Sequence, residues 1–252
     1  MKTKTVYDNL KLTFDEGYHI YSVNNKRIKN SVTGVTGLID KSPMLMGWAI
    51  KVMGICLIEL LGKNKKITEK DIINAKFEYK RIGKHSTDIG TQVHSWIERY
   101  IKRSDTQSLD VDDININDID ADEEAKSAIK AFLVWEKRVK PKFLGAEELL
   151  YSKKYNYAGM FDALIKVKNK IALVDFKTST AIWKEYRYQI AAYWYAWEEM
   201  TGQRIDNGLV LRLDKSTGLP ETLIISREES KKDYRAFLGL LSAKRRQNEL
   251  IN

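Results

Sequence analysis

The sequence predicts an α/β protein, in which a mostly helical first half is followed by a sheet flanked by helices. Two observations lead to this prediction. The hydrophobic period is helical over 42–103 and again over 125–140, where Pro141 ends it. After Pro141, three short β-rich segments follow one another and lead into a strongly aromatic helical segment. The hydrophobic period therefore changes from helical to β near the middle of the chain.

The elements of the first half follow in chain order. Residues 10–29 carry short β-like pieces with a turn at Asn24-Asn25, and helical runs extend over 42–103. Residues 105–124 hold nine acids and no Lys or Arg, which indicates a solvated loop or an insertion. The apolar stretch 44–61 is interrupted by Lys51 and Glu59, which favours a buried core helix over a membrane span.

The second half is predicted to hold the sheet. We expect strands over 147–151, 157–167 and 171–176, then a helix over 186–200, a hairpin from 209–213 and 222–225, and a basic helix over 228–250. We expect one domain over 1–252. It would contain a mostly helical part at 30–140, a sheet core at 141–226 and a C-terminal helix at 227–252.

Composition and net charge exclude some classes of function and favour others. The chain has 252 residues and a net charge of +9, and without 105–124 the other 232 residues carry a surplus of +18. Such a surplus favours a polyanionic partner, either nucleic acid or an anionic membrane. A single cysteine excludes a disulfide framework, a Cys-based zinc site and an iron–sulfur cluster within one chain. With three histidines, any metal must be held mainly by carboxylates. The N-terminus lacks a secretory pattern, so we expect a soluble protein in a reducing compartment.

Two carboxylates and one ammonium are predicted to converge. Asp162 and Asp175 lie on the two strands of an expected hairpin, where cross-strand neighbours come within about 5 Å. Asp175 and Lys177 are two residues apart, so they share one face of a strand. Because the surrounding strand is apolar, the charges must pair or bind a metal such as Mg²⁺ or Mn²⁺. The alternative is a salt-bridged surface pair, but Asp162 and the basic surplus favour the metal site.

Four further residues are candidates. Glu147 lies on the preceding expected strand and would otherwise be a surface charge. His94 follows Gly90 on a helix and could ligate a metal or be a satisfied core residue. Gln189 and Tyr193 are one helical turn apart on the aromatic helix, where they could face the site, stack on nucleotides or pack in the core.

The ordered set of motifs resembles the RecB-like branch of the PD-(D/E)XK nuclease superfamily. The motifs are Gly90-x-x-x-His94, Glu147, Gly159-x-x-Asp162, Asp175-x-Lys177-Thr178 and Gln189-x-x-x-Tyr193. Upstream, Ser31-Val-Thr33 followed by Leu45-x-x-Trp48-Ala49 is similar to a segment of phage-encoded exonucleases and of mitochondrial genome maintenance exonuclease. The likeness runs from Ser31 to Tyr193. It implies a restriction-endonuclease-like core, a central mixed sheet flanked by helices, with a helical N-terminal elaboration.

The resemblance also implies roles for individual residues. His94, Asp162, Asp175 and the backbone carbonyl of Phe176 would ligate Mg²⁺ or Mn²⁺, and Lys177 would orient or deprotonate the attacking water. Glu147 would support the metal site. Gln189 and Tyr193 would position the DNA strand, and Ser31 and Thr33 belong to the same substrate-binding set. The cellular setting it implies is the cytoplasm of a bacterium or phage-infected cell.

The predicted function is metal-dependent hydrolysis of DNA, with exonuclease action on single-stranded or end-containing DNA favoured because the helical half could form an arch. The alternatives are a structure-specific endonuclease, a non-catalytic nucleic-acid-binding protein and a phosphoesterase on small nucleotides. Candidates for gripping the DNA backbone are Lys184, Arg187 and Lys244-Arg245-Arg246. The acidic residues 105–124 are expected to face away from DNA or to act as an autoinhibitory DNA mimic. No membrane role is expected, and protein partners are not indicated.

Overall fold

The computed structural model describes residues 1–63, 66–104 and 114–250. The chain divides into two compact units, one formed by Met1–Leu38 together with Gln92–Asn252 and the other by Ile39–Thr91. The part of the acidic prediction that covers 105–113 lies outside the described residues. Every residue predicted to act in catalysis, metal binding or substrate binding belongs to the first unit.

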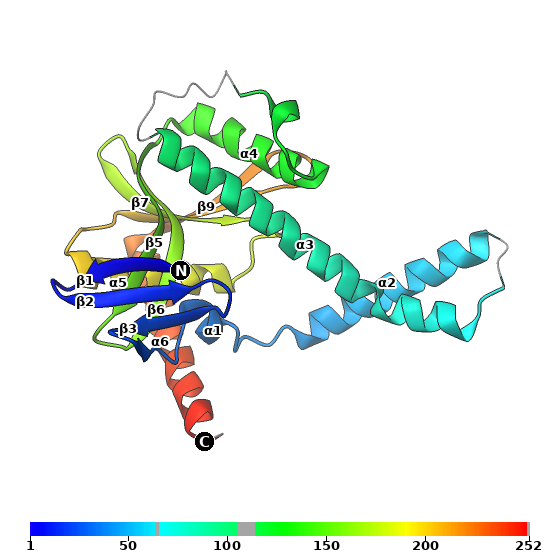
Figure 1. Ribbon diagram of the computed structural model, residues 1–252, viewed down its shortest axis with the longest axis horizontal. Helices are drawn as coiled ribbons and strands as arrows, with labels where there is room; N and C mark the ends of the chain where they lie inside the picture. The colour runs from blue at the N-terminus through cyan, green and yellow to red at the C-terminus, as the bar shows by residue number, and fades with distance from the viewer. Residues whose placement is uncertain (64–65, 105–113, 251–252) are drawn as a thin grey trace. The chain divides into compact units, whose positions relative to one another are not determined.

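A five-stranded mixed sheet forms the centre of the first unit (Figure 1). Its spatial order follows the chain: β5 (Lys142–Ser152), β6 (Tyr157–Val167), β7 (Lys170–Lys177), β8 (Asn207–Leu213) and β9 (Pro220–Ser226). The β7–β8 pair is parallel and the other pairs are antiparallel. The parallel pair needs a crossover, which helix α5 (Glu185–Thr201) provides.

Helices cover both faces of this sheet, and the burial of β7 shows it. Leu173 packs in a core with α5 and helix α6 (Arg227–Leu250), whereas the ring of Phe176 meets Phe132 of helix α4 (Glu123–Val139) edge-on at 5.6 Å. A strand that is covered on both faces has a continuous apolar sequence, as Ile171–Val174 has. The predicted class, an α/β protein with a central mixed sheet flanked by helices, is confirmed.

A second sheet precedes this core in the chain. It contains β1 (Lys2–Val6), β2 (Leu10–Asp15), β3 (Ile20–Val23) and β4 (Lys26–Arg27), all antiparallel. Its apolar face, which includes Leu12 and Phe14, packs against Leu149 and Tyr151 of β5. Strand β1 was absent from the sequence prediction, because its alternation of Lys and Thr carries almost no apolar signal. The short helix α1 (Val32–Thr36) follows.

The unit Ile39–Thr91 contains helix α2 (Ser42–Gly62) and the first part of helix α3 (Glu69–Ser104). The prediction that 44–61 forms a buried core helix is wrong. Val52 is the buried residue of α2, and large side chains such as Ile50 and Ile58 are more than 60% exposed. Apart from Lys51 and Glu59, apolar residues are distributed around the helix, so its sequence marks no single face for burial. By length and hydropathy α2 could also cross a membrane, and it is alone in this among the described helices.

The end of the acidic stretch also differs from the expected loop. The short 3-10 helix η2 (Ile116–Asp118) lies within it, and α4 already begins at Glu123. Glu123 and Glu124 occupy the first turn of α4, where carboxylates interact favourably with the helix dipole. Glu124 also pairs with Lys215 at 2.6 Å. At its other end α4 stops before Pro141, as predicted, with Lys140 in the left-handed region at φ 50°.

Candidate active site

The two motif aspartates meet where the β6–β7 ladder ends. The last registered pair is Ala163 with Val174, and on each strand the aspartate is the next residue away from the β6–β7 turn. Beyond it, the backbone N–H of Phe176 donates to Oδ2 of Asp162 at 2.6 Å. A side-chain carboxylate therefore takes over a hydrogen bond that the ladder would otherwise supply. This opening of the strands allows both carboxylates to face the same small volume.

Lys177 lies beside Asp175, as the spacing predicted. Its Nζ is 2.6 Å from Oδ2 of Asp175, and the two side chains are 18% and 4% exposed. The Lys177 ammonium also lies 4.9 Å from the ring centroid of Tyr186 at the start of α5, a cation–π distance. The pair is therefore largely shielded from solvent, unlike an ordinary surface salt bridge, and removing one partner would leave an uncompensated charge.

His94 reaches the same cluster from α3. Its Nδ1 is 3.2 Å from Oδ1 of Asp162, and its side chain is 31% exposed. The imidazole also lies edge-on to Phe176, with ring centroids 6.3 Å apart. His94 is thus a neighbour of the carboxylates, which the sequence could suggest only through the resemblance.

The four groups shift one another's pKa values. Burial raises the pKa of Asp175 to about 6; Lys177 opposes this rise, and the Asp162 charge adds to it. Burial would also raise the pKa of Asp162, but His94 and Lys177 outweigh it and hold that pKa below its usual value. Burial would lower the pKa values of His94 and Lys177, yet the neighbouring aspartates raise both. Perturbed titratable groups gathered in this way are typical of functional sites.

Gln189 and Tyr193 support Asp175 from α5. Gln189 donates from Nε2 to Oδ1 of Asp175 at 3.4 Å and to the hydroxyl oxygen of Tyr193 at 2.8 Å. Both residues are buried, at 7% and 2% exposure. They orient a carboxylate in this structure, and their predicted contact with DNA stays a prediction.

Gly159 is required by the close approach of Tyr193. A Cβ at this position would lie 2.6 Å from Cε1 of Tyr193 and 3.0 Å from Cγ2 of Val32 in α1. Real Cβ contacts essentially never come within 3.0 Å. The glycine of the Gly159-x-x-Asp162 motif therefore makes room for the residue that holds Gln189.

Glu147 lies on β5 as predicted, but its backbone is unusual. Its φ is +49°, in the left-handed region that non-glycine residues rarely adopt, and the irregular backbone there was not predicted. Its carboxylate pairs with Lys2 of β1, which also lies 3.5 Å from Glu98, one helical turn beyond His94. The structure thus ties Glu147 to the first strand, and its predicted support of a metal stays a prediction. Its neighbour Glu148 pairs with Lys4.

Ser31 and Thr33 lie at the start of α1. Ser31 is the N-cap, and its hydroxyl accepts the backbone N–H of Gly34 at 3.0 Å. Thr33 is exposed, with its hydroxyl 3.5 Å from that of Ser31. Ser31 also bridges to Ala158, the residue before Gly159. Capping accounts for Ser31, and the predicted substrate contact of both residues stays a prediction.

The predicted metal ligands form no ready-made cage. Among the residues that the structure describes, no group of three His, Cys, Asp or Glu side chains is arranged to hold a metal ion. The reason is visible in the contacts: Asp162 faces His94, and Asp175 faces Lys177 and Gln189. The donor chemistry still suits a hard cation, because Mg²⁺ usually takes one or two carboxylates together with water and substrate phosphate. Phe176 follows Asp175 and donates its N–H to Asp162, and the role of its carbonyl stays a prediction.

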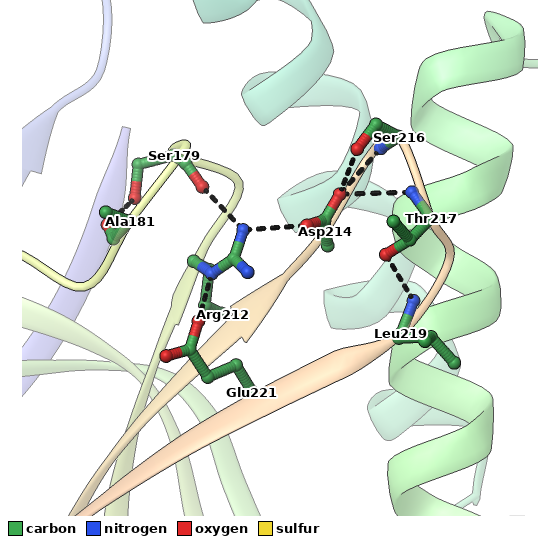
Figure 2. A network of polar contacts seen from close by, with 8 residues as sticks. All are labelled: Ser179, Ala181, Arg212, Asp214, Ser216, Thr217, Leu219 and Glu221. Atoms are coloured by element: carbon green, nitrogen blue, oxygen red, sulfur yellow. Dashed lines mark hydrogen bonds and ion pairs between the residues drawn. The ribbon is translucent and has the colours of Figure 1, made fainter.

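A network on β8 and β9 holds the loop that follows Lys177 (Figure 2). Arg212 is paired with Lys177 in the β7–β8 register. Its guanidinium donates to Glu221 at 2.6 Å, to Asp214 at 3.0 Å and to the Ser179 carbonyl at 3.4 Å. Hydrogen bonds from the Ser216 hydroxyl and amide lower the pKa of Asp214, which keeps the acceptor ionised. Arg212 was missed from the sequence, because nothing local marks an arginine that acts on a neighbouring strand.

The cations predicted to grip DNA are mostly engaged within the protein. Arg187 pairs with Asp233 at 3.0 Å and with Glu229. Arg246 pairs with Glu249 at 3.1 Å, and Arg245 donates to the carbonyl of Tyr155. These side chains have structural partners already, which weakens the case for them as phosphate ligands.

No family model matches the chain, and no curated protein matches it. Solved structures are similar in part. An alkaline exonuclease from Laribacter hongkongensis is 16% identical over 48% of this chain and 70% of its own, with a TM-score of 0.31. The structure of SSO0001 is 12% identical over 45% of this chain and 57% of its own, with a TM-score of 0.29. Both similarities are distant and cover less than half of this chain.

Proposed function

We propose that this protein is a divalent-cation-dependent nuclease that hydrolyses phosphodiester bonds of DNA. One observation carries the proposal: Asp162, Asp175 and Lys177 converge in a buried cluster at the end of the β6–β7 ladder. A buried and a partly buried carboxylate beside a lysine match the needs of phosphodiester hydrolysis, which must bind a cation and stabilise charge on phosphate.

Each residue has a role in the proposed reaction. Asp162 and Asp175 would hold a Mg²⁺ or Mn²⁺ ion, which when bound lowers the pKa of its water and neutralises the phosphate. The Lys177 ammonium would orient the attacking water or stabilise the charge that develops on phosphate. Gln189 keeps Asp175 turned toward the cluster, and Tyr193 keeps Gln189 in place. His94, whose Nδ1 is 3.2 Å from Asp162, would be a further ligand of that ion.

The finer part of the proposal is exonuclease action on single-stranded or end-containing DNA. A test should use one end-labelled linear strand, the same sequence as a circle, and duplex versions of both, with Mg²⁺, Mn²⁺ or EDTA. We expect cleavage with either cation, none with EDTA, and resistance of the circles. Cleaved circles would support the endonuclease alternative.

Two variants test the site. Asp175→Asn keeps the shape of the side chain and Lys177→Ala removes the ammonium, so each should lower the cleavage rate by at least about 10²-fold. Asp120→Asn is a matched control, because Asp120 is an exposed aspartate outside the cluster. Circular dichroism shows whether the variants fold. Full activity in either folded site variant would refute the assignment, and binding without cleavage by the parent protein would favour the non-catalytic alternative.

A further inference from the structure

One end of the central sheet carries a basic surface that the predicted site does not use. It is formed by the junction of α4 and β5 and by the β6–β7 turn. In 137–142 and 166–170, seven of eleven residues are Lys or Arg and none is acidic. We define the basic end as six exposed side chains from these segments: Arg138, Lys140, Lys142, Lys166, Lys168 and Lys170.

The part of the chain that the structure describes offers these cations no partner. Over the described ranges, none of the six side chains makes an ion pair or a hydrogen bond, in contrast to Arg187 and Arg246. The adjacent acid, Asp206, accepts the backbone N–H of Ile171 and lies 3.6 Å from Arg204. No described residue therefore compensates the positive charge of the basic end.

The register places like charges against each other. Lys142 of β5 is directly opposite Lys166 of β6, an arrangement that destabilises a sheet. Lys140 and Lys168 have φ values of 50° and 55°, a left-handed conformation that glycine and asparagine adopt more easily than lysine. Four lysines thus occupy positions where another residue would make the folded protein more stable, which points to a role outside folding.

A depression of about 650 Å³ opens beside the basic end. Ile165, Leu209 and Ile224 contribute to its largely apolar lining, and Ile224 is 66% exposed. Arg138, Lys168 and Lys170 also line it. Cations next to an exposed apolar surface suit a single nucleic-acid strand, whose phosphates and unstacked bases are both accessible. A duplex would offer the phosphates alone.

We propose that the basic end binds the backbone of a single DNA strand that leads to the carboxylate cluster. The inference rests on the proposed function. Lys166 lies four residues from Asp162 on β6, roughly 13 Å along the strand. Because the residues between them are buried, the DNA strand reaches the cluster around the sheet rather than along β6. The basic end holds the DNA strand at a distance from the bond that is cut, without reading its sequence.

The test combines Lys140→Gly with Lys168→Gly, because glycine fits both backbone conformations and the melting temperature should not fall. The control is Lys11→Gln with Lys26→Gln, which removes the same charge from exposed lysines of the N-terminal sheet. Each pair is made in an Asp175→Asn background, and binding of a fluorescent 20-nucleotide thymidine strand is measured without divalent cation at several salt concentrations.

We expect the glycine pair to weaken binding at least about fivefold and to reduce the slope of log K against log salt by roughly 1.4, since each phosphate contact on a single strand contributes about 0.7. The control pair should change neither. The inference would be overturned if the glycine pair and the parent had equal salt slopes, or if the parent bound a 20-base-pair duplex more tightly than the single strand. It would also be overturned if the glycine pair lost binding to phosphatidylserine vesicles but kept its binding to the thymidine strand. In the active protein, the glycine pair should slow cleavage of the 20-mer at limiting concentration and spare bis-p-nitrophenyl phosphate. Absence of all cleavage by the parent would instead count against the proposed function.

Discussion

Replacing Gly159 by alanine tests whether the glycine of the third motif exists to admit Tyr193. The added Cβ would lie 2.6 Å from a ring carbon of Tyr193, whereas carbon atoms in contact prefer about 3.5–4.0 Å. The ring must therefore retreat by about 1 Å, and it is 2% exposed with little room to do so. Overpacking of this kind costs about 1–3 kcal/mol.

The same displacement should reach the carboxylate cluster. The hydroxyl of Tyr193 accepts a hydrogen bond of 2.8 Å from Gln189, and a shift of about 1 Å would break it at a further cost of about 1 kcal/mol. We therefore expect Gly159→Ala to lower the free energy of unfolding by about 2–4 kcal/mol and to reduce DNA cleavage, because Asp175 loses its oriented donor. Urea denaturation followed by circular dichroism measures the first effect and a cleavage assay the second.

A control and a double-variant cycle sharpen this test. Gly239 lies within α6 with open space where its Cβ would be, so Gly239→Ala should stabilise the protein by about 0.5–1 kcal/mol. Replacing glycine by alanine should thus lower the free energy of unfolding at position 159 and raise it at position 239. In a Tyr193→Ala background, Gly159→Ala should cost much less than in the parent. An equal cost in both backgrounds would refute the proposed steric role of Gly159.

Three further predictions concern other parts of the first unit. Burial raises the pKa of Glu136 to about 7, so between pH 4.5 and 7 the folded state binds more protons than the unfolded state and this residue lowers stability as pH rises. In chemical denaturation, Glu136→Gln should therefore raise the free energy of unfolding by up to about 3 kcal/mol at pH 8 and by almost nothing at pH 4.5. A gain in stability that does not change with pH would contradict this. Arg212→Gln should slow cleavage several-fold while the free energy of unfolding falls by only about 1 kcal/mol, because the loop at Ser179 loses its anchor; an unchanged rate would show that this anchor is irrelevant to activity. Tyr193→Phe removes only the hydroxyl and should cost about 1 kcal/mol in urea denaturation with a matching loss of cleavage rate, whereas loss of stability alone would confine Tyr193 to the core.

The parts of the fold that the sequence predicted are those governed by local periodicity. The switch of period at Pro141, the turn after Val167 and the aromatic helix α5 all appear where expected. The same holds for Asp175 and Lys177, because two residues on one strand must share a face. Gln189 and Tyr193 meet for the equivalent reason on a helix.

The features that the sequence did not predict depend on distant partners. The pairing of Glu147 with Lys2 joins residues on different sheets, and β1 itself has no apolar alternation to mark it. The exposure of α2 could not be read from a helix that is apolar on every side. Arg212 acts through a parallel neighbour that lies more than thirty residues away in the chain.

The end of the β6–β7 ladder links the fold to the proposed chemistry. If the ladder continued past Ala163 and Val174, the N–H of Phe176 would bond a backbone carbonyl and Asp162 would have no reason to turn inward. The ladder ends where Glu147 of the adjacent strand adopts a left-handed conformation, so the irregularity spans β5, β6 and β7 at one level of the sheet. Such strain persists only when the surroundings hold it in place, and the Lys2 contact and the packing of α1 and α5 on Gly159 provide that support. The N-terminal sheet therefore contributes to the site through backbone geometry, although it supplies no residue of the carboxylate cluster.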